Sequence, residues 1–241
     1  GFAIVYDYKG ATHKMPGPKA LMETADWQAG KLKHCAAATW QLMHGDAAGK
    51  AAGEHYLKNL AQKQEAADAS FLDINVDEFT TDVGAKLAAI KVVAGVVQAA
   101  TRLPLSIDSS NPSILRAGLQ ACDKARGRPM VNSVSLERAD AIGVAAEHKA
   151  VVIASAAGEK DLPTTTEERI KNLDRLMEKL NAVAIAGDSV YIDPLVFPVA
   201  TDSNNAKSFL DAVSAMRAKY GAAIHVTGGL SNVSFGMPNR K

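Results

Sequence analysis

The stretch AAIHVTGGLSNVSFGMPNR, residues 222–240, begins with a short apolar run and continues into a loop of glycines and neutral polar side chains. The run Ala222–Thr227 is typical of a buried β-strand, and the paired glycines Gly228–Gly229 let the backbone turn sharply or approach a ligand closely. Ser231 and Asn232 then supply hydrogen-bond donors and acceptors without a fixed charge. A strand followed by such a loop is where α/β barrels place their chemistry, and an ordinary turn has the same composition.

The same pattern of a short apolar run followed by a helical segment repeats upstream of this stretch. The expected strands are 71–76, 103–107, 129–131, 150–155, 189–192 and 222–227. The expected helices are 82–100, one starting at Pro112, 136–148, 166–184 and 203–220. Because these strands are apolar throughout, they predict an α/β fold with a parallel sheet covered on both faces. With a less certain strand at 2–6, the count falls one short of a closed (β/α)8 barrel. Either the sheet is open and doubly wound, or a barrel lacks its last helix and strand.

The N-terminal third shows a different organisation. Residues 9–18 contain two glycines and two prolines and predict a loop. A helix capped by Thr24 or Asp26 is expected to run to about His44, and a second one, capped by Asp46, to about residue 67. We therefore expect a single barrel domain over residues 1–241, with an extra helical segment at about residues 24–53.

Charge and cysteine content exclude several classes of function. The formal net charge is +1, so no basic surface for nucleic acid is predicted. No apolar run is long enough for a membrane span. Cys35 and Cys122 lie far apart without a CxxC spacing, which argues against a zinc site or a disulfide framework and favours a reducing, cytoplasmic location. Both cysteines are expected to be buried packing residues.

Polar residues at the ends of the expected strands are the main functional signal. Five strands end in Asp or Asn, and in a parallel barrel such ends converge on one mouth. Carboxylates and amides there suit the hydrogen-bonding edge of a pterin or purine ring. Three Asp side chains could instead hold Mg²⁺, and each residue taken alone could be a turn former or a cap, as Asn111 before Pro112 is expected to be. The residues are Asp73, Asn75, Asp108, Asn132, Asp193 and Asn232.

Five motifs together resemble those of the pterin-binding methyltransferases. They are LDINV at 72–76, IDSSN at 107–111, VNS at 131–133, YIDP at 191–194 and GLSNVSFG at 229–236, and the resemblance runs from about residue 57 to residue 240. This family includes the methyltetrahydrofolate:corrinoid protein methyltransferases and the folate domain of cobalamin-dependent methionine synthase. The resemblance implies a (β/α)8 barrel related to dihydropteroate synthase and a role in one-carbon metabolism.

The resemblance also implies roles for individual residues. Asp108, Asn132 and Asp193 match the positions that hold the pterin ring, and Asp73 and Asn75 are further pterin-binding candidates. Asn232 matches the residue that hydrogen-bonds near N5 and is the expected catalytic residue, and Arg240 matches a position in the same loop that helps to shape the site. No metal site is assigned to the chain.

The implied reaction moves the N5 methyl group of methyltetrahydrofolate to the Co(I) centre of a corrinoid. The chain has no Asp-x-His-x-x-Gly corrinoid-binding motif, so the cobalamin is expected on a partner corrinoid protein. The other implied partner is a second copy of the chain in a homodimer.

One departure and two alternatives accompany this interpretation. Where the family has Gly-Glu-Arg-Ile-Asn after its first strand, this chain has the run Val5–Tyr8, and Asp7 is a weak substitute for the Glu. A dihydropteroate synthase is disfavoured because the run 231–233 stands where that enzyme has Ser-Arg-Lys. A non-catalytic folate-binding protein is the other alternative.

Overall fold

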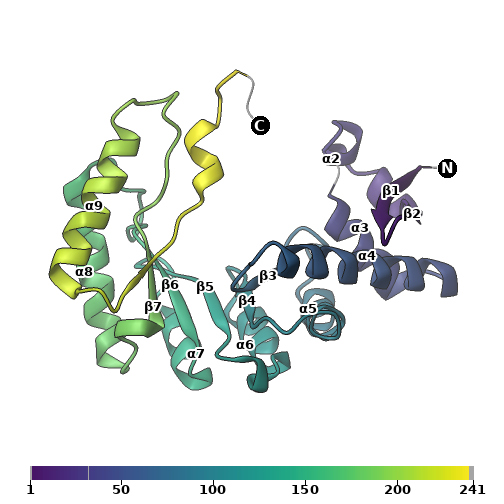
Figure 1. The fold of residues 1–241 in the computed structure, drawn as a ribbon, viewed down its shortest axis with the longest axis horizontal. Helices are drawn as coiled ribbons and strands as arrows, with labels where there is room; N and C mark the ends of the chain where they lie inside the picture. Colours follow the sequence, from purple (N-terminus) through teal and green to yellow (C-terminus); the bar gives the residue numbers. More distant parts are fainter. Residues whose placement is uncertain (1, 32, 239–241) are drawn as a thin grey trace. The chain divides into compact units, whose positions relative to one another are not determined.

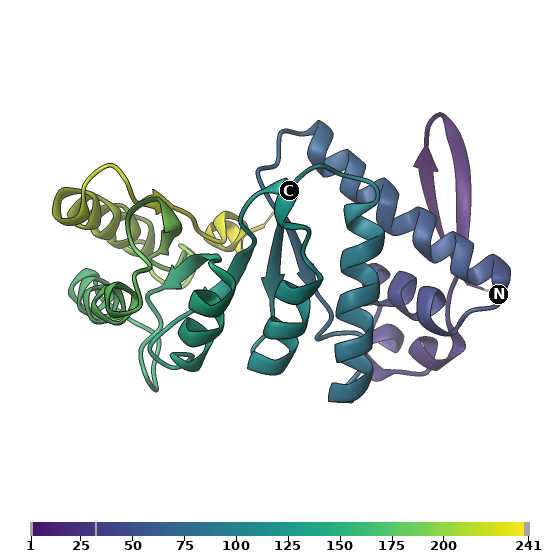
Figure 2. The ribbon, with the colours of Figure 1, turned by 90° about the horizontal axis from the view of Figure 1, so that it is seen from below.

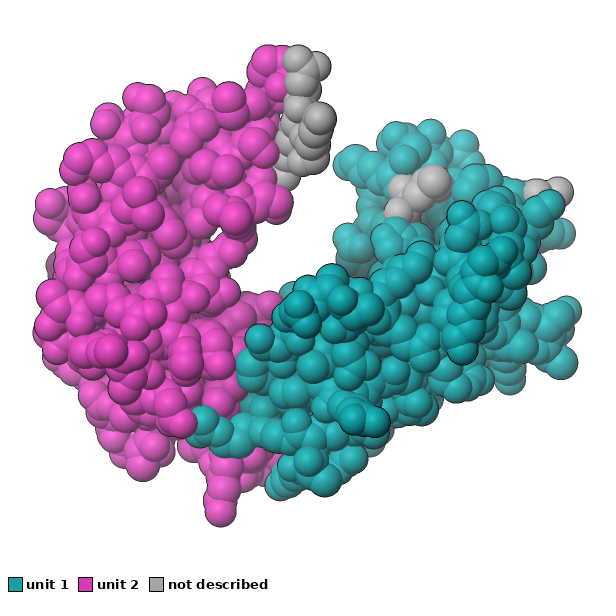
Figure 3. Space-filling view, in the orientation of Figure 1, with its two compact units in different colours: residues 1–129 teal, residues 130–241 magenta. Residues whose placement is uncertain are grey.

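Each of the six apolar runs expected to form the parallel sheet is a strand in the structure, a computed structural model that describes residues 2–31 and 33–238 (Figure 1). Contacts within the chain divide it into unit 1, Gly1–Pro129, and unit 2, Met130–Lys241 (Figure 3). Both units contain parallel strands followed by helices. The predicted α/β class is therefore confirmed, whereas a single domain stays a prediction.

Unit 2 contains four consecutive parallel strands. They are β5 (Met130–Val134), β6 (Val151–Ser155), β7 (Val190–Asp193) and β8 (His225–Val226), each paired with the next. The helices between them are α7 (Asp140–His148), α8 (Thr166–Ala182) and α9 (Asn205–Tyr220). Short 3₁₀ turns lie at Gly187–Ser189 (η2) and Leu230–Ser234 (η3).

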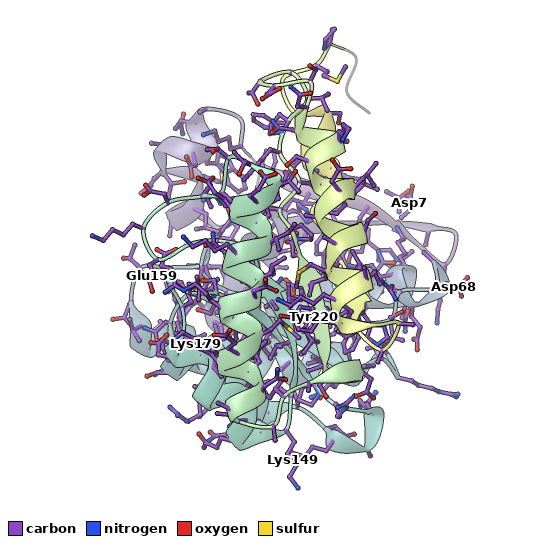
Figure 4. All side chains as sticks on the ribbon, turned by 90° about the vertical axis from the view of Figure 1, so that its left-hand side faces the viewer. Asp7, Asp68, Lys149, Glu159, Lys179 and Tyr220 are labelled. Atoms are coloured by element: carbon purple, nitrogen blue, oxygen red, sulfur yellow. The ribbon has the colours of Figure 1, made fainter. Side chains whose placement is uncertain are left out.

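Helix α8 shows why these segments fold as they do. A capping box starts the helix, in which the Thr165 hydroxyl accepts from the Glu168 backbone N–H and the Glu168 side chain accepts from the backbone N–H of Thr165. Leu173, Leu176 and Leu180 recur at helical spacing and are fully buried. Helices α8 and α9 lie side by side in Figure 4. The Tyr220 hydroxyl at the end of α9 donates to Asp174 Oδ1 at 2.8 Å.

Unit 1 contains two parallel strands, β3 (Leu72–Asn75) and β4 (Leu105–Asp108). They alternate with α5 (Val83–Gln98) and α6 (Pro112–Ala121), and a 3₁₀ turn, η1, follows at Lys124–Arg126. The predicted cap at Asn111 is confirmed, because its Oδ1 accepts from the N–H groups of Ser113 and Ile114. Helices α3 (His34–His44) and α4 (Ala47–Ala66) precede β3.

The prediction of a loop at residues 9–18 is wrong. Strands β1 (Ala3–Tyr8) and β2 (Ala11–Pro16) form an antiparallel hairpin that packs on α4 (Figure 2). Lys9 and Gly10 both have positive φ, 48° and 77°, which gives a two-residue turn whose twist suits a hairpin. The expected strand at 2–6 therefore does not belong to the parallel sheet. Asp7 lies on this hairpin, where its carboxylate accepts from Thr12 Oγ1 at 2.8 Å.

The single helix expected from Thr24 or Asp26 to His44 is also wrong. The chain instead forms α1 (Lys19–Met22), α2 (Ala25–Gln28) and α3. Thr24 caps α2 as predicted, but Gly30 at φ +78° cannot continue a right-handed helix and separates α2 from α3. No helix in the described part of the chain is long and apolar enough to cross a membrane.

Candidate functional site

The polar end of β3 faces away from the core of unit 1. Leu72 and Ile74 are buried, whereas Asp73 and Asn75 are exposed on the other face of the strand, as the two-residue period of a strand requires. Asn75 stands opposite Asp108 of β4 in the strand register. Its Nδ2 donates to Asp108 Oδ2 at 2.8 Å. The structure thus brings together two residues that the sequence proposed separately.

A second layer of hydrogen bonds orients this pair. The carbonyl oxygen of the Asn75 side chain accepts from the backbone N–H of Asp77 at 2.7 Å, which leaves the amide nitrogen directed at Asp108. Asp77 Oδ1 pairs with Lys86 Nζ of α5 at 3.2 Å and accepts from Ser109 Oγ at 3.2 Å. Sequence reasoning passed over Asp77, Lys86 and Ser109 as site residues. Only the proximity of Asp77 to Asn75, and of Ser109 to Asp108, could have signalled two of them.

A cavity of about 370 Å³ adjoins the same end of β3 within unit 1. Asp73, Asn75 and Asp77 are among the polar residues that line it. The rest of its wall is mainly apolar and comes from α3, α4, β3 and α5, with Ala36, Leu57, Leu60, Ile74, Val93 and Val97. Unit 1 therefore offers a carboxylate and amide edge beside an apolar space, an arrangement that suits a flat ring with a polar rim.

In unit 2, Asn132 lies half-buried in β5, between the buried residues Val131 and Val134. The pairing register between β5 and β6 shifts between these two valines. Such an irregularity re-aims the side chains within it, and this is a common device at strand ends near binding sites.

Asp193, the last residue of β7, is tied into the loop that follows it. Its Oδ1 accepts from the backbone N–H of Leu195 at 2.8 Å, and its backbone carbonyl accepts from Ala156 N at 2.9 Å. Leu195 adopts a positive φ of 71° to make this turn. Burial raises the pKa of the Asp193 carboxyl, and the Leu195 N–H opposes this by a smaller amount. A desolvated carboxylate of this kind gains strongly from a ligand that donates hydrogen bonds to it.

The expected catalytic residue, Asn232, lies on the exposed turn η3. Its backbone N–H donates to Gly229 O at 2.9 Å, and a Cβ at Gly229 would lie 2.9 Å from Asn232 Nδ2. The absence of a side chain at Gly229 therefore makes room for the Asn232 amide. The N–H of Val199 donates to Val233 O at 3.1 Å, which connects the turn to the loop after β7. Arg240 lies outside the described residues.

Two aromatic rings precede these polar ends on the sheet of unit 2. Tyr191 and His225 are partners in the register of β7 and β8, and their rings stack with centroids 4.4 Å apart and planes at 19°. His225 is exposed, and β8 extends over only two residues beside β7. Tyr191 shares the face of Asp193 by the two-residue period and was missed by sequence reasoning.

The remaining titratable candidates are inert or unsuited to metal binding. Cys122 donates to Gly118 O at 3.3 Å, and burial raises its pKa to about 12, so the thiol stays protonated at neutral pH. Cys35 is exposed, contrary to expectation, because it lies at the start of α3. Among the described residues, no group of three or more His, Cys, Asp or Glu side chains is arranged to hold a metal ion.

A sequence profile of the pterin binding enzymes matches residues 52–240. The chain belongs to this family. The match covers β3 to η3 and all the candidate site residues, whereas the hairpin and α3 lie before it. Family membership confirms the resemblance found in the sequence, and the strand–helix repeat of the structure agrees with the predicted α/β class. The missing last helix and strand and the pterin-binding roles of single residues stay predictions.

Relatives of this chain include a methyltransferase and a methionine synthase. A methylcorrinoid:tetrahydrofolate methyltransferase from Eubacterium limosum is 30% identical over 193 residues, 78% of this chain and 69% of that protein. A methionine synthase from Mycobacterium leprae (strain TN) is 31% identical over 200 residues, but the match covers 76% of this chain and only 16% of that protein. A dihydropteroate synthase from Xanthomonas albilineans, solved with 7,8-dihydropteroate, has a TM-score of 0.46 and 18% identity, covering 73% of this chain and 80% of that one.

Proposed function

We propose that the protein transfers a methyl group between N5 of tetrahydrofolate and the cobalt of a corrinoid carried by a partner protein. In the direction predicted from the sequence, methyltetrahydrofolate and Co(I) with one proton give tetrahydrofolate and methyl-cobalt. The Eubacterium relative is named for the reverse direction, methylcorrinoid to tetrahydrofolate. The same residues serve both directions, because forward and reverse reactions share one transition state.

The half-buried Asp193 carboxylate, whose pKa is raised by desolvation, is the observation that carries the proposal. A pterin presents a ring N–H beside an exocyclic amine, and a carboxylate can accept from both. The Leu195 N–H uses one of roughly four acceptor positions of Asp193, which leaves capacity for this edge. Asn132, half-buried in β5 of the same unit, supplies a further neutral partner of the kind that a pterin needs.

Asn232 would act on N5. A tertiary amine leaves poorly, so N5 must gain a proton or a strong hydrogen bond as the methyl–nitrogen bond breaks and its electron pair moves to nitrogen. The Asn232 amide is on an exposed turn and carries no charge, which suits stabilising the developing N5–H while water supplies the proton. The corrinoid partner supplies the Co(I) nucleophile.

The test is methyl transfer between methyltetrahydrofolate and free cob(I)alamin under anaerobic conditions, followed by the change in cobalt absorbance and repeated in reverse. Transfer in either direction supports the proposal. Folate binding without transfer would select a non-catalytic folate-binding protein, and condensation of p-aminobenzoate would select a dihydropteroate synthase.

Replacing Asn232 tests its role directly. Asn232→Ala is expected to lower the rate of transfer about 100-fold, the loss typical of a donor that acts in the transition state, with little change in the Kd for tetrahydrofolate. Asn181→Ala, at an exposed position near the end of α8, is the matched control and should keep the wild-type rate. An Asn232→Ala variant with full rate and unchanged pH dependence would remove Asn232 from the mechanism.

A further inference from the structure

Arg169, in the first turn of α8, is fully buried although it carries a charge. Its Nε donates to the carbonyl of Pro194 at 2.9 Å, and its Nη1 donates to Ser208 Oγ at 2.8 Å and to Thr165 O at 3.2 Å. The guanidinium also lies over the ring of Phe197, 4.9 Å from its centroid. One side chain of α8 thus contacts both α9 and the loop that follows β7.

Burial of this guanidinium is costly. Burial lowers the pKa of Arg169, and the opposing charge is Glu168 on the solvent side of the same helix turn. Among the described residues, no carboxylate forms an ion pair with Arg169. Within the same part of the chain, the Nη2 atom of Arg169 is buried and has no hydrogen-bond partner. A buried charge without an ion pair is expensive, and an apolar side chain would fill the same space at less cost. The free-energy cost of burying Arg169 indicates that its planar guanidinium, with several N–H donors, is needed at this position.

The segment that Arg169 holds carries the candidate site. Pro194 directly follows Asp193, and Phe197 lies three residues further along the same loop. Asp193 in turn accepts from Leu195, which lies between the two residues that Arg169 contacts. The loop then reaches the Asn232 turn through the hydrogen bond from Val199 N to Val233 O. Arg169 therefore braces the segment between the two residues proposed to meet the pterin.

We propose that Arg169 is a positioning residue, which fixes the loop of residues 194–199 so that the Asp193 carboxylate is presented to the pterin ring. This inference rests on the proposed function, because it assumes that Asp193 binds the pterin. Arg169 acts through the backbone at Pro194 rather than through its charge. Its Nε donates to the carbonyl of Pro194, the residue after Asp193, so the contact with the loop is a hydrogen bond to the backbone.

The experiment measures the Kd for tetrahydrofolate in four proteins: wild type, Arg169→Gln, Asp193→Asn and the double variant. Losing one hydrogen bond of a charged group corresponds to about a tenfold weaker affinity, so Arg169→Gln is expected to raise the Kd about tenfold. In the Asp193→Asn background, Arg169→Gln should raise the Kd less than about twofold, because the effects of two residues that act through one another are not additive. Arg175→Gln is the matched control, since Arg175 lies on the exposed face of α8 and pairs with Glu159 at 2.6 Å.

A variant with conserved charge separates geometry from electrostatics. Arg169→Lys keeps the charge but cannot reach Pro194 and Ser208 together, so it should lose affinity nearly as much as Arg169→Gln. If Arg169→Gln does not fold, Ser208→Ala replaces it in the cycle, because it removes one acceptor and leaves Arg169 in place. Ser208→Ala is expected to raise the Kd about threefold, again only while Asp193 is present.

Additive losses in the cycle, or full affinity in Arg169→Lys, would overturn the positioning role. Wild-type protein that does not bind tetrahydrofolate would instead overturn the proposed function. The two failures are therefore distinguishable in the same titrations.

Discussion

Replacing Asp193 by Asn should weaken pterin binding and stabilise the protein at the same time. The substitution keeps the shape of the side chain and an oxygen that can accept from Leu195 N, now 2.8 Å from Oδ1. It removes the negative charge and replaces one acceptor with an amide donor. The two expected effects have opposite signs, which distinguishes them from general damage to the fold.

The size of the binding loss follows from the hydrogen bonds at stake. A carboxylate facing the ring N–H and the exocyclic amine makes two charge-assisted bonds, each worth about 1.5–3 kcal/mol. With one bond lost and the other reduced to a neutral one, about 2.5–4.5 kcal/mol disappears. The Kd for tetrahydrofolate should therefore rise by about two to three orders of magnitude. Titration of wild type and Asp193→Asn with tetrahydrofolate measures it directly.

The stability effect depends on pH. Burial raises the folded-state pKa of Asp193 above its value in the unfolded chain, which is about 3.9. The ionised side chain therefore lowers stability, and this loss appears as the pH rises through the folded-state pKa. Asp193→Asn avoids the loss, so it should have the higher Tm at pH 7. Each kcal/mol recovered corresponds to about 2–4 °C in a chain of this size, and the difference should vanish below about pH 4.

Thermal unfolding at pH 7 and at pH 3.5, followed by circular dichroism, checks this pattern. A Tm difference that is the same at both values, or an Asp193→Asn variant less stable at pH 7, would refute the argument from burial. An unchanged Kd for tetrahydrofolate would refute the assignment of Asp193 to the pterin.

Two further substitutions probe other candidate residues, one in each unit. Asn75→Ala removes the donor to Asp108 and should raise the Kd for tetrahydrofolate about three- to tenfold. Asn75→Asp places a second carboxylate beside Asp108 and should raise the Kd further. Equal increases in the two variants would refute the proposal that Asn75 orients Asp108. Gly229→Ala brings a Cβ to 2.9 Å from Asn232 Nδ2 and should lower the transfer rate about tenfold with little change in Kd. Gly143→Ala, a helical glycine with nothing within 4 Å of the added Cβ, is the control and should keep the rate.

The sequence predicted the strands and their polar ends because both signals are local. A short apolar run bounded by turn residues is visible without knowledge of the fold, and so is a cap such as Asn111 in front of Pro112. The two-residue period of a strand likewise puts Asp73 and Asn75 on one face. These features depend on neighbours in the chain.

The errors arose where the local signal was weak. The hairpin turn uses Lys9 at a positive φ of 48°, a conformation that a lysine seldom adopts, so no Asn-Gly or Asp-Gly signature marked it. The bonds of Asn75 to Asp108 and of Lys86 to Asp77 join different elements of unit 1. Pairings of this kind depend on strand register and helix placement, which one sequence does not reveal.

The loop after β7 shows why burial, rather than residue type, separates functional from structural polar residues. Asp193 and Arg169 are both ionisable groups whose charged forms are penalised by burial, and they bind the same loop without pairing with each other. A chain selected for stability alone would gain from neutral side chains at both positions. Burial of both charged groups in one segment has an explanation if the Asp193 carboxylate binds a ligand and the Arg169 guanidinium holds the adjacent backbone in place. The double-mutant cycle on Arg169 and Asp193 measures whether those two costs serve one function.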